Sequence, residues 1–451
     1  MKLGCESYRR MNRRDFFRVG GTGLFGLTLA DFFRAQAASG PKPKAKQAIF
    51  IFLMGGPTQN DTFDMKPDRP AEVRGPFKPI ATAVPGLQIC EHLPRLAKLA
   101  GKYSVLRSVN ARGYPEAGDH HGGHSWKTGN PRALRGTPKY PMYGSVVAKL
   151  CPAPAELPAF VSLGAVDTHA PGLKENYLGP AYDPLSVSVD APRGKEVDPL
   201  TQMLAPAQLD VPGFERNVEL LRALEQQLRK QDTVDPLTAG LDQFQQKAFD
   251  LLRSPKLREA LNLEKEPAKN RERYAVGLQH YGKNNFTRRV LAARRLIEAG
   301  VPFVYLDLPY WDWHGGGGLE VPMATFPAFD AAFASLVEDL DERGLLETTA
   351  VIATGEMGRT PKVATGKPYG REHWSGSQIV LTAGGGFQPG IVLGATDQDA
   401  AYVKDKEYKV ASLGKTLYHL LGLDPDHELL TPDNRPLKLI TEDVPLIKEV
   451  L

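Results

Sequence analysis

The chain contains only three cysteines among its 451 residues, so the redox chemistry open to it is small. Cys5 lies close to the N-terminus, which leaves Cys90 and Cys151 in the body of the chain. These two residues could form one disulfide, but a sequence does not show whether two Cα atoms come close enough for the bond. One disulfide and two buried free thiols therefore both stay open.

Long apolar segments are also missing. The run from Val19 to Ala30 ends at Asp31. It is too short for the hydrocarbon core of a bilayer, which needs about 20 apolar residues in a helix. No other segment comes near that length, so the sequence predicts no transmembrane helix.

The body of the chain has no excess of either charge. The formal net charge is +4. Residues 1–40 hold seven basic and three acidic side chains, and this difference of +4 accounts for the whole excess. A neutral body offers no general field that would hold a nucleic-acid backbone. We therefore expect no nucleic-acid partner.

Three catalytic signatures are absent as well. The sequence has no His-Glu-x-x-His motif, no Gly-x-Ser-x-Gly motif and no P-loop. These absences argue against zincin proteases, ordinary serine esterases and P-loop nucleotide hydrolases.

The N-terminus has the pattern of an export signal. Arg13 and Arg14 precede Asp-Phe-Phe, the apolar run follows, and an Ala-x-Ala site occupies 35–37. A basic region, a short apolar region and such a site are typical of a secretory signal, and the arginine pair favours the twin-arginine route. An amphipathic anchor helix is the alternative. We expect the twin-arginine translocase as an export partner and a periplasmic or extracellular location.

The rest of the chain predicts a doubly wound α/β fold in three layers. Apolar runs bounded by turn residues predict buried strands, mostly parallel, and segments of helical periodicity alternate with them. The predicted strands are Ala48–Met54, Tyr103–Val109, Val301–Asp307, Thr348–Thr354, Gln378–Ala383 and Gly390–Leu393. The predicted helices are His92–Ala100, Phe286–Ala299, Phe326–Arg343 and Ser412–Leu421. We expect a signal peptide at 1–37, a linker at 38–46, and one domain at 47–451 with a loop-rich part at 152–210 and a helical insertion at about 211–283.

Carboxylates follow the first and the third of these strands. Asp61 and Asp64 come after a glycine turn, and Asp312 and His314 stand among tryptophans. In doubly wound sheets, functional groups gather at the carboxyl ends of the strands. A buried polar group needs a partner, and a cation is a suitable one for Asp312 and His314. Turn capping and a surface loop with aromatic packing are the alternatives.

Histidines follow the second strand in the glycine-rich segment 119–129. His120, His121 and His124 lie within five residues, with Asp119 and Ser125 beside them. Imidazoles together with a carboxylate are suitable ligands for Zn, Mn or Fe. The segment is therefore a candidate for metal binding at His120 and His124 and for catalysis at His121 and Ser125. Hydrogen bonding to backbone is the alternative.

Charged side chains follow the fourth strand. Glu356 comes directly after it, Arg359 stands three residues later, and Arg371 and His373 belong to a second motif. The two guanidiniums could hold an oxyanion by paired hydrogen bonds. They could equally pair with neighbouring glutamates in a structural network. We predict Glu356 at a metal or catalytic position.

The order of the motifs resembles the secreted bacterial family called domain of unknown function 1501. The motifs are GGPTQNDTFD, HSWKTGNPR, WDWHG, TGEMGRTP, GREHW and SLGKTLYHLLGLD, over nearly the whole chain. That family resembles the alkaline phosphatase superfamily, whose members hydrolyse or transfer phosphate or sulfate esters with one or two metal ions. The resemblance implies an alkaline-phosphatase-like fold, with metal ligands at Asp61 or Asp64, at Asp312 and His314, and at His373, and with Glu356 in place of an aspartate.

This sequence departs from the superfamily's sequence pattern in two places. Glu356-Met357 replaces its Asp-His or Asp-Asn pair, and no Cys or Ser stands in a sulfatase nucleophile motif. We therefore carry two hypotheses. One is an exported hydrolase of small-molecule or glycan phosphate or sulfate esters, dependent on a divalent metal such as Zn, Mn or Ca. The other is a non-catalytic exported binding or assembly protein. If one metal site exists, the His314 and His373 imidazoles should lie within about 5 Å of each other, because ligand–metal bonds are about 2.0–2.2 Å.

Overall fold

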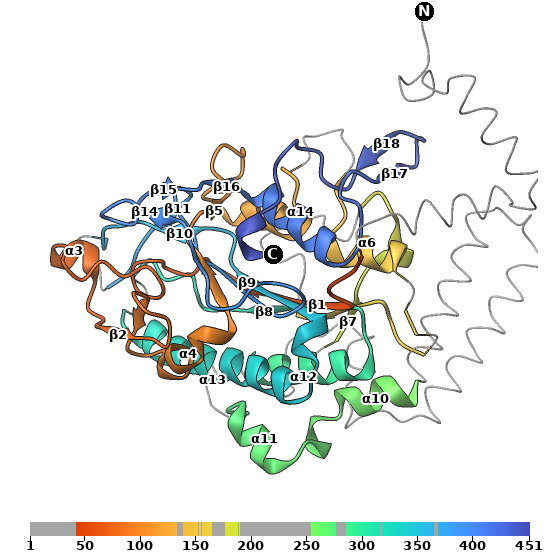
Figure 1. Ribbon diagram of the computed structural model, residues 1–451, viewed down its shortest axis with the longest axis horizontal. Helices are drawn as coiled ribbons and strands as arrows, with labels where there is room; N and C mark the ends of the chain where they lie inside the picture. The colour runs from red at the N-terminus through yellow and green to blue at the C-terminus, as the bar shows by residue number, and fades with distance from the viewer. Residues whose placement is uncertain are drawn as a thin grey trace, which may run out of the picture.

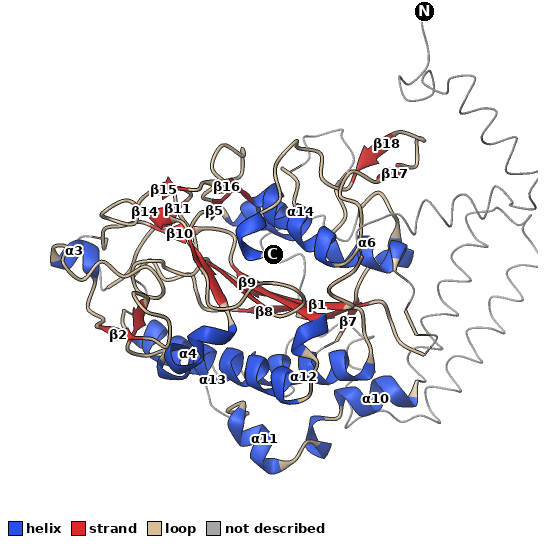
Figure 2. Ribbon diagram, in the orientation of Figure 1, coloured by secondary structure: helices blue, strands red, loops and turns tan. Residues whose placement is uncertain are grey.

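The central element is an eight-stranded sheet (Figure 2). The computed structural model describes residues 42–132, 139–151, 153–154, 156–164, 176–187, 189, 254–276, 286–315, 318–364 and 369–451. In order across the sheet, the strands are β13 (Val392–Leu393), β4 (Ser104–Leu106), β12 (Val380–Ala383), β9 (Thr349–Thr354), β1 (Gln47–Leu53), β8 (Phe303–Leu308), β6 (Phe160–Leu163) and β7 (Leu185–Ser186). Only β12 runs antiparallel to its neighbours; the other pairs in this sheet are parallel.

The middle strand, β1, determines where the carboxyl ends of its neighbours lie. It pairs with β8 on one side and β9 on the other, and Phe52 lies level with both Asp307 and Thr354. All residues of β1 after Gln47 are buried, which explains why the run is apolar throughout. The loops that follow β1, β8 and β9 therefore begin at the same edge of the sheet.

Helices cover both faces of the sheet (Figure 1). Ile49 and Ile51 belong to the core under α4 (Pro94–Leu99), α12 (Phe286–Ala299) and α13 (Glu320–Glu342). Phe50 and Phe52 belong to the opposite core, with α5 (Gly123–Thr128), α6 (Tyr143–Leu150) and α14 (Val410–Leu420). Successive residues of a strand point to opposite faces, so one apolar run supplies both cores. The predicted three-layer, mostly parallel α/β fold is confirmed.

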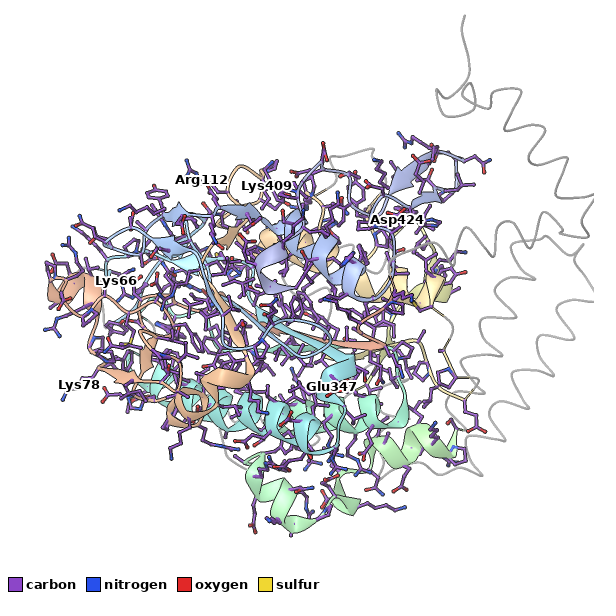
Figure 3. All side chains as sticks on the ribbon, viewed as in Figure 1. Lys66, Lys78, Arg112, Glu347, Lys409 and Asp424 are labelled. Carbon is purple, nitrogen blue, oxygen red and sulfur yellow. The ribbon has the colours of Figure 1, made fainter. Side chains whose placement is uncertain are left out.

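Short elements connect these layers. They are α3 (Ala71–Arg74), β2 (Pro79–Ala81), β3 (Gln88–Cys90), η2 (Ala100–Lys102), β5 (Val109–Asn110), η3 (His120–Gly122), η4 (Pro180–Tyr182), α10 (Pro255–Leu261), η5 (Leu263–Lys265), α11 (Ala268–Arg273), η7 (Leu346–Thr348), β10 (Gly358–Arg359), β11 (His373–Trp374), β14 (Ala395–Thr396), β15 (Val403–Asp405), β16 (Tyr408–Lys409), β17 (Glu428–Leu430), β18 (Pro436–Lys438) and η8 (Lys448–Val450). Charged side chains such as Lys78, Glu347 and Asp424 lie at the outside of the molecule (Figure 3).

Three local predictions need correction or restriction. The segment 152–210 is not only loop, because β6 and β7 lie in it and join the central sheet; their four and two residues are too short to show a period. The strand predicted at Tyr103–Val109 is divided between β4 and β5. The helices α10 and α11 fall within the predicted insertion, whereas 211–253 and the leader at 1–41 lie outside the described residues.

The two cysteines of the body are free thiols. Cys90 belongs to the core beneath α12 and α13, whereas Cys151 packs against the core on the other face of the sheet. The sheet therefore separates them, which excludes a disulfide between them; of the two free thiols, Cys90 is buried and Cys151 is only partly buried. Burial raises the pKa of Cys90 to about 12, so its thiol stays protonated at neutral pH. Within the described part of the chain, no helix has the length and apolar character needed to cross a membrane.

Candidate metal centre

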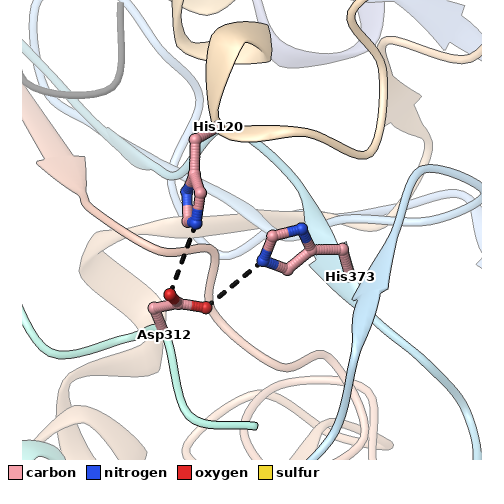
Figure 4. Close-up of side chains that lie close together, drawn as sticks. All are labelled: His120, Asp312 and His373. Carbon is pink, nitrogen blue, oxygen red and sulfur yellow. Dashed lines mark hydrogen bonds and ion pairs between the residues drawn. The ribbon is translucent and has the colours of Figure 1, made fainter.

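Asp312 is the middle of a polar cluster at the carboxyl edge of the sheet. It stands in the loop after β8, and His120 and His373 approach its carboxylate from two other parts of the chain (Figure 4). His314, two residues after Asp312, also contacts this carboxylate. The Asp312 Oδ2 lies 3.3 Å from the His120 Nε2. Its Oδ1 lies 2.8 Å from the His314 Nε2 and 3.3 Å from the His373 Nε2. All three imidazoles therefore present the same nitrogen, Nε2.

The three rings lie close together. The His373 ring centroid is 4.6 Å from that of His120 and 4.6 Å from that of His314. The predicted proximity of His314 and His373 is thus confirmed. One ligand atom each of His120, Asp312 and His373 lies within 4.8 Å of the other two, a spacing that a single ion can bridge.

Two further carboxylates are hydrogen-bonded to two of these imidazoles through Nδ1, the ring nitrogen that does not contact Asp312. Glu356 is buried, and its Oε1 lies 2.8 Å from the His120 Nδ1. The Gly55 N–H donates to both Glu356 oxygens, at 2.9 and 3.0 Å. Glu372 is hydrogen-bonded to the His314 Nδ1. A carboxylate bonded to this outer nitrogen, Nδ1, fixes the tautomer of the imidazole. The inner nitrogen, Nε2, is then left as a ligand atom, as is usual for metal-binding histidines.

The loop after β1 requires glycine where it passes this cluster. Gly55 has a φ of +107°, and a Cβ at this position would lie 2.3 Å from the Asp312 backbone nitrogen. Gly56 has a φ of +86°, and its Cβ would lie 2.4 Å from the Met357 carbonyl oxygen. Only glycine permits both the backbone conformation and this close approach. The sequence GGP therefore places the Gly55 N–H on Glu356.

The charges in the cluster shift two pKa values in opposite directions. Partial burial raises the pKa of Asp312, but hydrogen bonds from His120, His373 and Arg359 outweigh it and hold the pKa well below its ordinary value. Hydrogen bonds to Asp312 and then to Glu356 raise the pKa of His120 to about 9, against the opposing effect of burial. Carboxylates that attract a proton to His120 attract a metal ion in the same way.

Comparison with known proteins places the chain in a family. The family model described as protein of unknown function (DUF1501) matches residues 45–451. The chain belongs to this family. The resemblance predicted from the motifs is therefore confirmed. None of the curated proteins compared with the chain matches it.

Several solved structures are distantly similar to this DUF1501 chain. A phosphonate monoester hydrolase from Silicibacter pomeroyi is 12% identical, with 90% of this chain and 76% of that chain covered and a TM-score of 0.37. An alkaline phosphatase from the Antarctic bacterium TAB5 is 11% identical, with coverages of 84% and 98% and a TM-score of 0.38. A sulfatase from Pseudoalteromonas sp. is 13% identical, with coverages of 87% and 70% and a TM-score of 0.35. Likenesses of 11–13% identity and TM-scores of 0.35–0.38 assign no activity to this chain.

The first-loop aspartates are not in the DUF1501 centre. Asp61 forms a buried ion pair with Arg371, whose Nε and Nη2 lie 2.8 and 2.9 Å from its two oxygens. Asp64 lies 3.1 Å from the Lys66 Nζ and 3.3 Å from the Arg107 Nε. Each carboxylate is thus neutralised by its own cations. The structure therefore supports neither aspartate as a ligand, and it buries Arg371 away from solvent instead of presenting it to a substrate.

The other residues of 119–129 also have separate surroundings. The His121 Nδ1 is bonded to Asp119 at 2.9 Å, on an exposed stretch. Ser125 is buried and donates its hydroxyl to the Gly122 carbonyl, 3.0 Å away, which is a local helix contact and not the setting of a nucleophile. His124 is buried, and burial lowers its pKa to about 4. Among the histidines of this segment, only His120 belongs to the candidate metal centre.

Sequence reasoning missed one participant, Glu372, and left the role of another, Glu356, open. Glu372 was not predicted as a site residue, although it directly precedes His373 and holds His314. Glu356 was predicted as a ligand or as a residue that orients one, and its bond to His120 favours the second role. The sequence offered little signal for these pairs, because Glu356 lies 236 positions from His120 and Glu372 lies 58 positions from His314.

Proposed function

We propose that this DUF1501 chain is a hydrolase of phosphate or sulfate esters that depends on one divalent transition-metal ion. His120, Asp312 and His373 would hold the ion, with His314 as a fourth ligand. The observation that carries the proposal is the convergence of three Nε2 atoms on one carboxylate, with a carboxylate on the outer nitrogen of His120 and of His314. A cluster of histidines and carboxylates is also found as a plain ion-pair network, but matched outer carboxylates favour a metal centre.

The donor set discriminates among the metals that the sequence left open. Three of the four proposed ligand atoms are imidazole nitrogens, and the fourth is a carboxylate oxygen of Asp312. Ca²⁺ takes oxygen ligands, whereas imidazole suits Zn²⁺ and other transition metals. We therefore propose Zn²⁺ first and Mn²⁺ second, and we no longer expect Ca²⁺ at this centre.

Access from solvent favours a reactive centre over a closed structural one. The side chains of Asp312 and His314 are 36% and 35% exposed, so the inner face of the cluster is open. When bound there, an ion would polarise an anionic ester oxygen. Glu356 and Glu372 would keep His120 and His314 in the ligand tautomer during turnover. The exposed imidazole edges of His314 and His373 would face the ester.

The placement of Ser125 argues for direct attack by water on the ester. Its hydroxyl is buried and already donates to backbone, so a covalent intermediate on Ser125 is not supported. Arg359 and Arg371, which were expected to hold the ester oxygens, are also buried. The substrate would therefore be held mainly through the metal centre, which suits small-molecule or glycan esters with an accessible anionic group.

Metal analysis and an ester screen test this proposal together. The mature chain should contain close to one Zn²⁺ or Mn²⁺ after export in a native host, and it should hydrolyse generic aryl phosphate or aryl sulfate esters. Asp312→Asn should lose both the ion and the turnover, because it removes the charge at the middle of the cluster. The exposed His427→Gln is the matched control and should retain both.

Two outcomes would contradict the proposal in different ways. Absence of bound metal under every condition would remove the centre itself. Bound metal without turnover on any ester would favour the alternative, an exported binding or assembly protein that uses the ion to hold a ligand. Export by the twin-arginine translocase, and hence a periplasmic or extracellular site of action, belongs to both versions of the proposal.

A further inference from the structure

We propose that the Arg359 guanidinium occupies the position of a second cation, so that the centre takes one transition-metal ion and not two. This inference rests on the proposed metal centre and extends it. Arg359 lies in β10, opposite His373 of β11, and its side chain is 1% exposed. A charged group so deeply buried requires strong compensation.

The compensation comes from a set of five oxygens around the guanidinium. The Nε donates to the Gly56 carbonyl at 3.3 Å, and the Nη1 donates to the Arg371 carbonyl at 3.1 Å. The Nη2 donates to the carbonyls of Gly55 and Trp311 and to the Asp312 carboxylate. Backbone carbonyls with one carboxylate are the ligand type that hard cations prefer. We call these five oxygens the oxygen cage.

Asp312 connects the oxygen cage with the imidazoles. Its Oδ1 accepts from Arg359 and lies next to the Nε2 atoms of His314 and His373, while its Oδ2 lies next to His120. In two-metal hydrolases the ions stand about 3.5–4 Å apart and act on one substrate from two sides. Here a single carboxylate lies between the ligand nitrogens and a fixed guanidinium. One of two cation positions is thus already filled by the protein.

The charge balance agrees with this assignment. Three carboxylates, those of Asp312, Glu356 and Glu372, and one guanidinium form the centre. Together they leave two negative charges, which one divalent ion neutralises. A second divalent ion would leave an excess of two positive charges beside a buried arginine. Arg359 is therefore a positioning residue that acts through Asp312 and not a residue that contacts the substrate.

Ion counting on the metal-stripped mature chain tests the inference. The wild type should take up one Zn²⁺ per chain even with Zn²⁺ in excess, as counted by native mass spectrometry. Arg359→Ala removes the guanidinium from the oxygen cage. When Ca²⁺ is the only metal supplied, this variant should bind one Ca²⁺ in the cage. Wild type should bind none there. Millimolar guanidinium should compete with that Ca²⁺, because it restores the missing group.

Arg359→Lys is the matched control. It keeps a positive charge in the oxygen cage, so it should bind no additional Ca²⁺. Thermal unfolding of both variants shows whether the fold survives. If Arg359→Ala does not fold, the ion count of the wild type and of Arg359→Lys still decides the question.

The possible results separate this inference from the proposed function. Two Zn²⁺ ions in the wild type, or a folded Arg359→Ala that binds no Ca²⁺, would overturn the inference, and ester turnover by the wild type would still decide whether the chain is a metal-dependent hydrolase. One Zn²⁺ without ester turnover would remove the hydrolase but support the inference. No bound Zn²⁺ in the wild type would overturn both.

Discussion

Replacing Glu356 by glutamine is a sharp test of the metal centre, because the change keeps the size of the side chain and removes its charge. The carboxylate accepts from the Gly55 N–H with both oxygens and from the His120 Nδ1 with one. An amide has one oxygen and one NH₂ group, so in either orientation its NH₂ group faces the Gly55 N–H, a donor. If that group also faces the His120 Nδ1, the imidazole must carry its proton on Nε2, the ligand atom.

The expected magnitudes follow from these contacts. Loss of an outer carboxylate typically weakens metal affinity by about 10- to 100-fold, which equals about 1.4–2.7 kcal/mol. One buried donor left without an acceptor costs about 1–3 kcal/mol of folding stability. We therefore expect the Zn²⁺ dissociation constant of Glu356→Gln to rise by one to two orders of magnitude and ester turnover to be lost, while the chain remains folded.

A chelator competition titration at pH 7.5 measures the affinity, and thermal unfolding of the metal-free chains measures the fold. The exposed Glu347→Gln is the control and should match the wild type in both. An unchanged Zn²⁺ affinity in Glu356→Gln would refute the assignment of Glu356 to the metal centre. Full turnover with weakened affinity would refute only its catalytic importance.

Three other predictions concern stability and export. His124 has a folded pKa of about 4, below its ordinary 6.5, so the unfolded chain binds more protons between these values and stability falls as pH falls. Between pH 7 and pH 5, the unfolding free energy of the wild type should fall by about 2 kcal/mol more than that of His124→Phe, as measured by urea unfolding. The same pH dependence in both proteins would contradict this prediction. Arg294 is 1% exposed and paired with two buried carboxylates, so Arg294→Met should cost about 3–5 kcal/mol by urea unfolding. Removing the exposed Lys102–Asp341 pair should cost under about 1 kcal/mol, and an equal cost would contradict the distinction. Replacing Arg13 and Arg14 by lysine should leave precursor in the cytoplasm on fractionation, and normal export would exclude the twin-arginine route.

The central part of the fold could be predicted because its signals are local. The seven-residue run of β1 and the helix Phe286–Ala299 have lengths and periods that identify them directly. β6 could not be found in this way, since its four residues lie in a segment without periodicity and are defined only by pairing with β8. Helix α13 begins at Glu320, six residues before the predicted start, and continues through Pro327. Tertiary packing on the sheet overrides the local preference there.

The residues of the candidate metal centre could be predicted from residue type and from their place at strand ends, but their hydrogen-bond and ion-pair partners could not. Asp312, His314 and His373 were correctly expected to come close, because they follow or flank strand ends at one edge of the sheet. Asp61 has the same position in sequence terms, yet it lies against Arg371, a residue 310 positions away. Such long-range ion pairing leaves no trace in spacing. The sequence could therefore propose candidates but could not choose among carboxylates that only the assembled sheet distinguishes.

The register that makes β1, β8 and β9 end together has a consequence for the stage of folding at which the proposed ion could bind. The three residues whose ligand atoms meet, His120, Asp312 and His373, lie at least 61 positions apart in the sequence, so only the tertiary fold brings them together. A fragment that lacks any one of these three segments would lose a ligand. An ion that binds only the complete fold stabilises it by mass action, by about 2.7 kcal/mol at a free concentration 100 times the dissociation constant. Occupancy of the centre would thus report whether a molecule has finished folding, in a chain predicted to leave the cytoplasm by a route that carries folded cargo.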